Sequence, residues 1–277
     1  MPEGPEVAIE TKRLAHTILG WKVKHLKYLE RGKKPAQEQY AAFMDFIAPG
    51  DQKITAIESH GKKTWLKVGG VWNVLFSYGL SGTFVLPGEL TEEEQARESK
   101  NFVYEIIVTS DAGDTKTVYF SDSIAYGSAS FISNENLQNV ISKLGPDPLK
   151  GPIKDGYLST LKEKRSTRDI SDFLTDNKVI AGMGNTYLSE VLYKTGVHPT
   201  AIVGSIPDKV LNQIQVYSVS VMKEAYECMC QNTNYKFSVY AKASDPRGRT
   251  VSKIRSSYNQ SARYYCEDVQ KIGRVTL

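Results

Sequence analysis

The spacing of the apolar residues changes near residue 134, and this change constrains the fold more than any other feature of the sequence. Before it, short apolar segments are separated by glycine and Asp/Asn turns, which is typical of a β-sandwich. After it, apolar residues recur at the three- and four-residue spacing of helices. We therefore predict an α+β chain with two domains, residues 1–133 and residues 134–277.

The same pattern predicts the individual elements. The expected strands are Val23–Leu29, Ile54–Glu58, Trp65–Val68, Trp72–Phe76, Thr83–Leu86, Phe102–Thr109 and Thr117–Phe120. The helices expected after the N-terminal one are Glu38–Ile47, Asn134–Leu144, Tyr157–Glu163, Ile170–Leu174, Tyr187–Thr195 and Asp208–Gln231. Residues 87–100 are acidic and rich in turn formers, so we expect an exposed loop there. From Phe237 the β pattern returns, with a hairpin turn at residues 244–248.

A first helix is expected almost at the N-terminus, within the opening Met1-Pro2-Glu3-Gly4-Pro5-Glu6. Pro5 suits the first helical position, and Glu6 suits the positive end of the helix dipole. Gly20 is expected to end the helix. Its buried face is expected to comprise Val7, Thr11, Leu14 and Ile18.

Removal of Met1 would leave the secondary amine of Pro2 beside the carboxylate of Glu3. An α-amino group has a pKa of about 7.7–8.0, against about 10.4 for lysine, so more of it is free base at neutral pH. Attack of this amine on a sugar C1′ would give an iminium, an electron sink like a lysine Schiff base. An ordinary helix start explains the same residues equally well.

Charge and cysteine content indicate which partners the protein can bind and which kinds of site it lacks. Residues 1–133 carry a net charge of −2 and residues 134–277 carry +6, so the second half suggests a polyanionic partner. Cys228, Cys230 and Cys266 make no disulfide framework, and the absence of a Cys-x-x-Cys pair excludes a four-cysteine zinc site. No apolar run reaches transmembrane length and the N-terminus is not a signal peptide, so we expect an intracellular protein.

Three other stretches carry residues suited to binding or catalysis. Lys62 follows Gly61 between two expected strands, although a lysine there is usually a surface charge. The segment 76–82 contains two glycines that allow a tight loop to present Leu80, or simply form a hairpin. In the segment 176–190, a glycine-rich turn precedes a helix with Asn185 near its start. Backbone N–H groups there can hold a phosphate, and Asn185 can add a donor or merely cap the helix.

Taken together, these stretches resemble the formamidopyrimidine-DNA glycosylase/endonuclease VIII family. The resemblance covers nearly the whole chain, and its motifs occur in the family's order. They are Pro2-Glu3-Gly4-Pro5-Glu6, Gly61-Lys62, Gly79-Leu80-Ser81-Gly82, Leu144-Gly145-Pro146-Asp147-Pro148-Leu149 and residues 176–199, which end in Gly196-Val197-His198-Pro199.

The resemblance implies a β-sandwich led by the N-terminal helix, then a helical domain with a helix–two-turn–helix motif and an antiparallel β finger, with DNA between the domains. It also implies catalytic roles. Pro2 would be the nucleophile, Glu3 would handle protons at the sugar, and Lys62 would contact phosphate and assist catalysis, with Lys63 as an adjacent rival. The damaged nucleotide would have to leave the duplex first.

The sequence departs from the family pattern in three ways. The finger, at about residues 237–273, has Cys266 as its only cysteine, so we expect a zincless finger and no metal site. Ser261 occupies the position of the family's finger arginine, and Arg263 keeps the same strand face, so Arg263 is the expected substitute. The side chains that fill the gap left by the flipped nucleotide map to Leu80, Ile124 and Tyr126, and Ile124 stands where most members have arginine.

The remaining expectations concern DNA contacts. Arg165, in the basic run 162–168, is expected to bind backbone phosphate, whereas Lys162 and Lys164 are expected to face solvent. Lys100 is also predicted to contact DNA. Arg263 is expected to reach a phosphate beside the flipped nucleotide, so that Arg263→Ala would fold normally.

The sequence thus predicts a bifunctional DNA glycosylase and abasic-site lyase that needs no cofactor. Oxidised pyrimidines and ring-opened purines are the favoured substrates, and an 8-oxoguanine-type purine enzyme is the alternative. A catalytically silent binder of damaged DNA is the alternative from another class, and retention of Met1 would favour it. We expect a monomer in the nucleus or another DNA-containing compartment, with damaged double-stranded DNA as partner and no membrane association.

Overall fold

The computed structural model describes residues 2–256 and 261–271, which divide into two compact units. The first unit holds Pro2 and residues 6–142, and the second holds residues 143 onward together with Glu3–Pro5. The sequence places α4 (Asn134–Ile141) in the second domain, but the structure counts it with the first unit. The reason is packing, because Leu137 is buried against Trp65 and Leu75.

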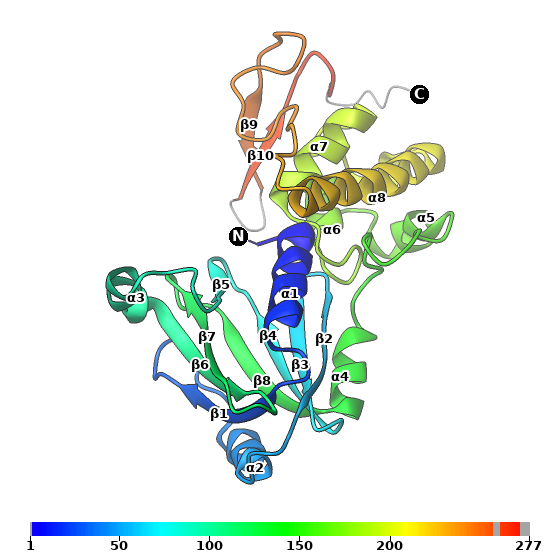
Figure 1. Cartoon of the computed structure of the whole chain (residues 1–277). Helices are drawn as coiled ribbons and strands as arrows, with labels where there is room; N and C mark the ends of the chain where they lie inside the picture. Colours follow the sequence, from blue (N-terminus) through cyan, green and yellow to red (C-terminus); the bar gives the residue numbers. More distant parts are fainter. Residues whose placement is uncertain (1, 257–260, 272–277) are drawn as a thin grey trace. The chain divides into compact units, whose positions relative to one another are not determined.

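The first unit is a sandwich of two four-stranded antiparallel sheets (Figure 1). One sheet has the order β1-β6-β7-β5, formed by Lys22–Tyr28, Phe102–Thr109, Thr115–Asp122 and Gly82–Val85. The other has the order β2-β3-β4-β8, formed by Ile54–His60, Lys63–Val68, Trp72–Ser77 and Ser128–Ser133. Both sheets and α2 (Gln37–Ile47) contribute to one apolar core. The predicted sandwich is confirmed, with β8 as a strand that the sequence pattern did not indicate.

The first helix, α1, spans Gly4–Ile18 and buries the face that the sequence indicates. Val7, Leu14 and Ile18 are inaccessible to solvent and belong to the sandwich core. The hydroxyl of buried Thr11 lies 2.6 Å from that of Thr64 on β3, which satisfies both polar groups inside the core. Burial of this face fixes α1 on the sandwich.

The acidic segment before β6 forms a helix rather than the expected loop. α3 spans Glu92–Glu98 and is preceded by Thr91, which caps it. The Thr91 hydroxyl accepts the N–H of Glu94, and the Glu94 carboxylate accepts the N–H of Thr91. This reciprocal capping box satisfies two end groups and lets an exposed, polar helix form.

The second unit is helical, and its core contains only residues from that unit. Its helices are α5 (Tyr157–Lys162), α6 (Ile170–Leu174), α7 (Asn185–Thr195) and α8 (Asp208–Cys230), with short 3₁₀ turns at η2 (Glu163–Arg165) and η3 (Val203–Ser205). Gly196 ends α7 in the left-handed conformation, as expected of a C-terminal glycine. No helix in the described part of the chain is long and apolar enough to cross a lipid bilayer.

The finger is a two-stranded sheet of β9 (Ser252–Arg255) and β10 (Ala262–Tyr265). The predicted turn at 244–248 is present, with Gly248 at a positive φ of 77° and an isolated bridge between Ser244 and Thr250. The segment that starts at Phe237 is not a strand, contrary to expectation. Part of the predicted finger, residues 257–260 and 272–273, lies outside the described residues.

The carboxylate of Glu190, on α7, explains why the segment after Phe237 is not extended. It accepts the backbone N–H groups of Ser238, Val239 and Tyr240 at 2.8, 2.9 and 2.9 Å. Glu190 is completely buried. Three consecutive N–H groups that converge on one acceptor form a tight turn rather than a strand, and this turn attaches the start of the finger to α7.

We expect Glu190→Ala to lower the free energy of unfolding by about 3 kcal/mol or more, because each buried donor left without an acceptor costs roughly 1–3 kcal/mol. Urea unfolding followed by circular dichroism would measure the change. Glu190→Gln, which keeps an acceptor oxygen, should lose less. Exposed Glu224 on α8 provides the matched control. Equal stability of the Glu190→Ala and Glu224→Ala proteins would contradict this role for Glu190.

Candidate functional site

Glu3 is buried at the N-terminus of α7, 2% exposed. Its two carboxylate oxygens accept the N–H groups of Thr186 at 3.0 Å and Tyr187 at 3.4 Å. The N-cap residue of α7 is Gly184, which has no side chain to cap the helix. Glu3, near the N-terminus of the chain, therefore supplies the acceptor that Gly184 lacks, and the helix dipole stabilises its negative charge.

The turn before α7 is shaped to accept this carboxylate. The N–H of Gly4 donates to the carbonyl of Gly182 at 2.9 Å, which fixes the chain opening against the turn. A Cβ at Gly184 would lie 2.2 Å from the carboxyl carbon of Glu3, and one at Gly4 would lie 2.7 Å from Cε of Met222. Glycine at 184 is thus a requirement of the close approach of Glu3.

Pro2 and Lys62 belong to the first unit, and both are partly exposed. Pro2 directly precedes Glu3, so the fixed carboxylate restricts where its nitrogen can lie. Lys62 occupies the tight turn between β2 and β3, next to Gly61 at a positive φ of 56°. The rival, Lys63, donates to the Ser77 hydroxyl at 2.8 Å, and burial followed by the nearby Lys33 charge lowers its pKa.

The three side chains predicted to fill a gap in DNA are exposed in the structure. Leu80, Ile124 and Tyr126 are 42%, 49% and 67% exposed, respectively. Leu80 lies between β4 and β5, and the other two lie between β7 and β8. Exposed apolar side chains in two loops are suited to insertion into an apolar or stacked partner.

Asn185 is the first residue of α7 and is partly exposed. Because the N-cap position belongs to Gly184, a capping role does not account for this asparagine. Lys100 is exposed within η1 (Ser99–Asn101) and comes directly after the acidic α3. Both residues remain predicted DNA contacts.

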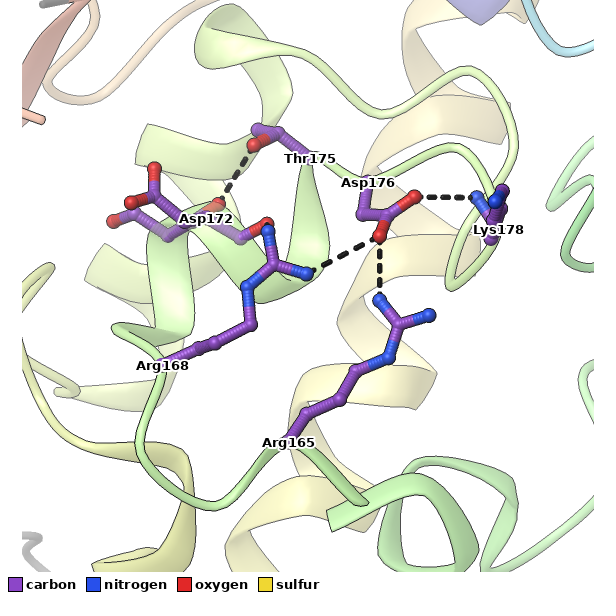
Figure 2. A network of polar contacts seen from close by, with 7 residues as sticks. Arg165, Arg168, Asp172, Thr175, Asp176 and Lys178 are labelled. Atoms are coloured by element: carbon purple, nitrogen blue, oxygen red, sulfur yellow. Dashed lines mark hydrogen bonds and ion pairs between the residues drawn. The ribbon is translucent and has the colours of Figure 1, made fainter. Parts of the chain in front are cut away.

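Arg165 contacts a carboxylate on the turn that leads to α7. Figure 2 shows Arg165 and Arg168 directed at Asp176, whose Oδ2 accepts a hydrogen bond from each guanidinium. Burial alone would raise the pKa of Asp176, but the Lys178 amide and the two arginines outweigh it and hold the pKa below its usual value. The positive charge of Arg165 is therefore partly neutralised by Asp176 before any phosphate binds.

Lys162 does not face solvent as expected. Its Nζ donates to the carbonyl of Ile206 at 2.7 Å and pairs with Asp208 at 3.3 Å, which attaches the end of α5 to the start of α8. Lys164 is exposed, in agreement with the expectation.

Arg263 lies inside the second unit and is 1% exposed. Its Nη2 is 3.2 Å from Oδ1 of Asp172 on α6, and the same oxygen accepts the Ser256 hydroxyl at 2.7 Å. Burial lowers the pKa of Arg263, while the charges of Asp172 and Glu3 oppose that shift. Nε and Nη1 of Arg263 have no hydrogen-bond partner among the described residues. The sequence contains no signal that would identify Asp172 as the partner.

The burial of Arg263 changes what its removal should do. Arg263→Ala would leave the Asp172 carboxylate buried without its cation, so we expect it to destabilise the fold by about 3–5 kcal/mol, not to fold normally. Thermal or urea unfolding measures this loss. Arg255→Ala, an exposed arginine on the paired strand β9, should change stability by no more than about 0.5 kcal/mol.

A double variant separates the buried charge from simple loss of packing. Asp172→Ala in the Arg263→Ala background removes the uncompensated carboxylate, so it should restore part of the lost stability. If Arg263→Ala is as stable as Arg255→Ala, the ion pair with Asp172 does not contribute to the fold.

Comparisons with known proteins cover almost the whole chain. The family model described as the formamidopyrimidine-DNA glycosylase N-terminal domain matches residues 1–128, and the model of the H2TH domain of the same glycosylase matches residues 144–236. A formamidopyrimidine-DNA glycosylase from Escherichia coli O6:H1 is 24% identical, and the alignment covers 98% of this chain and 100% of the relative.

Solved structures show the same fold. The Lactococcus lactis formamidopyrimidine-DNA glycosylase bound non-covalently to DNA with an AP site has a TM-score of 0.79 at 18% identity. A variant of that protein in complex with DNA containing Fapy-dG has a TM-score of 0.78 at 18% identity. Each likeness covers 98% of this chain and 100% of the other, so the architecture is shared from end to end.

Proposed function

The chain belongs to the formamidopyrimidine-DNA glycosylase family, and on this premise we propose how its own residues perform the reaction. It is a DNA glycosylase that acts on damaged bases, and its partner is DNA that contains such bases or abasic sites. In the proposed reaction the free amine of Pro2 attacks C1′ of the damaged nucleotide. The bond from C1′ to the base breaks, and the base leaves with the proton that the amine gives up. The C1′–O4′ bond then breaks as O4′ takes up a proton, and the cationic iminium that results joins Pro2 to the opened sugar.

The second half of the proposed reaction cleaves the strand. The iminium withdraws electrons from C1′, so a proton is lost from C2′ and the 3′ phosphate leaves by elimination. Water then hydrolyses the iminium and frees Pro2. These steps balance without a metal or a redox cofactor.

The observation that carries the proposal is the fixed carboxylate of Glu3 next to Pro2. Two N–H groups at a helix N-terminus hold this carboxylate in place, and it can accept a proton at the reacting sugar. Its burial excludes bulk water from the same oxygens. We propose that Glu3 moves protons at the sugar while Pro2 forms the covalent bond, and that Lys62 contacts the neighbouring phosphate.

We further propose phosphate contacts at Lys100, Arg165, Asn185 and Arg263. The partly exposed side chain of Asn185, at the first position of α7, supports this contact because its amide can donate a hydrogen bond to a phosphate oxygen. For Arg165, a phosphate has to compete with Asp176. For Arg263, Nε and Nη1 have no partner among the described residues but are buried, so this contact requires the guanidinium to turn outward when DNA binds. Such contacts position the duplex and do not read its sequence.

We propose oxidised pyrimidines and ring-opened purines as the preferred substrates, with 8-oxoguanine as the second candidate. Gly4 in the opening and the finger without a cysteine ligand set support the first choice. Ile124 has no donor that could read the base opposite the lesion, so excision should depend little on that base.

The proposal is tested by borohydride trapping on duplexes that carry an abasic site, an oxidised pyrimidine, a ring-opened purine or 8-oxoguanine, each opposite all four bases. Borohydride reduces the iminium to a stable amine, so we expect a covalent complex on the first three and little preference among opposite bases. Pro2→Gly, which leaves a primary amine, should retain part of the trapping.

A protein with an N-terminal tag is the control, because the tag blocks the Pro2 amine and should abolish trapping. Undiminished trapping with the blocked terminus would move the nucleophile to a lysine. Trapping confined to 8-oxoguanine opposite cytosine would favour the second substrate class, and no trapping with a free Pro2 would favour a silent binder.

A further inference from the structure

The three exposed apolar side chains lie on two separate loops that must act together. Leu80 is on the turn between β4 and β5, while Ile124 and Tyr126 are on the turn between β7 and β8. These side chains can separate stacked bases only if they keep their spacing when the bases resist insertion. Loops connected only through their strands would not provide such rigidity.

Asp122, at the end of β7, joins the two loops. Its side chain is fully buried, and its Oδ1 accepts the hydroxyl of Ser81, the residue after Leu80. The same carboxylate accepts the N–H of Ile124 at 3.2 Å through Oδ1 and the N–H of Gly127 through Oδ2. One carboxylate therefore contacts the residue that follows Leu80, the backbone of Ile124 and the residue that follows Tyr126.

Further contacts reinforce this connection. Ser81 accepts the N–H of Ile124 at 3.1 Å and the hydroxyl of Ser123 at 3.1 Å. Arg31, from the segment after β1, donates to the carbonyls of Ser123 at 2.9 Å and Asp122 at 3.3 Å. Burial would raise the pKa of Asp122, but the hydrogen bonds from Ser81, Gly127 and Ile124 lower it overall, so the carboxylate stays ionised.

The loop backbones also approach each other closely. Gly79 has a positive φ of 60°, and a Cβ on it would lie 2.7 Å from both the nitrogen of Gly127 and the carbonyl carbon of Tyr126. Ala125, between the two exposed side chains, also has a positive φ of 62°. This uncommon conformation turns the chain so that Ile124 and Tyr126 both lie at the surface.

We propose that Asp122 is a positioning residue that makes Leu80, Ile124 and Tyr126 one rigid wedge for insertion into the base stack. The proposal rests on the proposed function, since the wedge acts during extrusion of the damaged nucleotide. Asp122 itself is buried and acts through the loops that it holds. Its removal should therefore impair steps that need base extrusion and spare reaction at a sugar that is already accessible.

The test compares Asp122→Ala, Asp122→Asn and Ser81→Ala with the wild type. Single-turnover excision from a paired duplex reports extrusion and chemistry together. Lysis of a preformed abasic site in single-stranded DNA reports chemistry without extrusion. 2-Aminopurine placed beside the lesion reports unstacking by its fluorescence, independently of catalysis.

A matched control removes a buried polar residue elsewhere in the sandwich. Asn73 is fully buried near the start of β4, at the opposite end of that strand from the Leu80 loop, and donates to Asn134 at the start of α4 at 3.0 Å. Asn73→Ala should weaken the fold without changing the wedge.

We expect Asp122→Ala to lose about tenfold or more in duplex excision and most of the fluorescence change, with single-stranded lysis unchanged. Ser81→Ala and Asp122→Asn should show smaller losses of the same kind.

Two results would overturn the proposal. The first is Asp122 variants that match Asn73→Ala in excision and fluorescence. The second is an equal loss of duplex excision and single-stranded lysis, which would give Asp122 a general role in folding. Failure of the proposed function looks different, because wild-type protein would then show neither excision nor lysis, while the fluorescence would still report the wedge.

Discussion

The contact between the Glu3 carboxylate and the first turn of α7 is the interaction on which the candidate site depends. α7 begins at a glycine N-cap, so its N–H groups require an acceptor from elsewhere, and Glu3 provides it. The same contact fixes the residue next to the Pro2 amine. The N–H groups at the start of this helix therefore also position the carboxylate that is proposed to serve the reaction.

Buried carboxylates have a second role in the finger, whose strands are only four residues long. A sheet of that size is not stable alone. Glu190 holds the segment before the finger, Asp172 pairs with Arg263 on β10, and Asp245 accepts the N–H groups of Arg247 and Arg249 in its turn, both at 2.9 Å. The Tyr193 hydroxyl on α7 also donates to Asp245 at 2.9 Å, so all three carboxylates connect the finger segment to the helices. Among the described residues no group of three or more potential metal ligands occurs.

The sequence predicted most of the elements because their signals are local. The apolar face of α1, the alternation in the sandwich strands and the turn around Gly248 all depend on neighbouring residues. The α3 helix was missed even though Thr91 and Glu94 carry a capping signal, because the acidic composition suggested a loop. The partners of Arg263, Arg165 and Ser81 could not be predicted, since Asp172, Asp176 and Asp122 lie 91, 11 and 41 residues from them, and only the fold brings each pair together.

Single-turnover base excision by Gly184→Ala tests the central claim most directly, because an added Cβ would displace the Glu3 carboxylate without removing any catalytic group. The matched control is Gly204→Ala, where a Cβ would crowd Ser166 in the same unit and away from Glu3. The account predicts that Gly184→Ala folds but loses up to about 100-fold in excision, the scale expected for a misplaced catalytic group, and that the change has little further effect in a Glu3→Ala background. Excision by Gly184→Ala equal to that of the Gly204→Ala control would contradict the account.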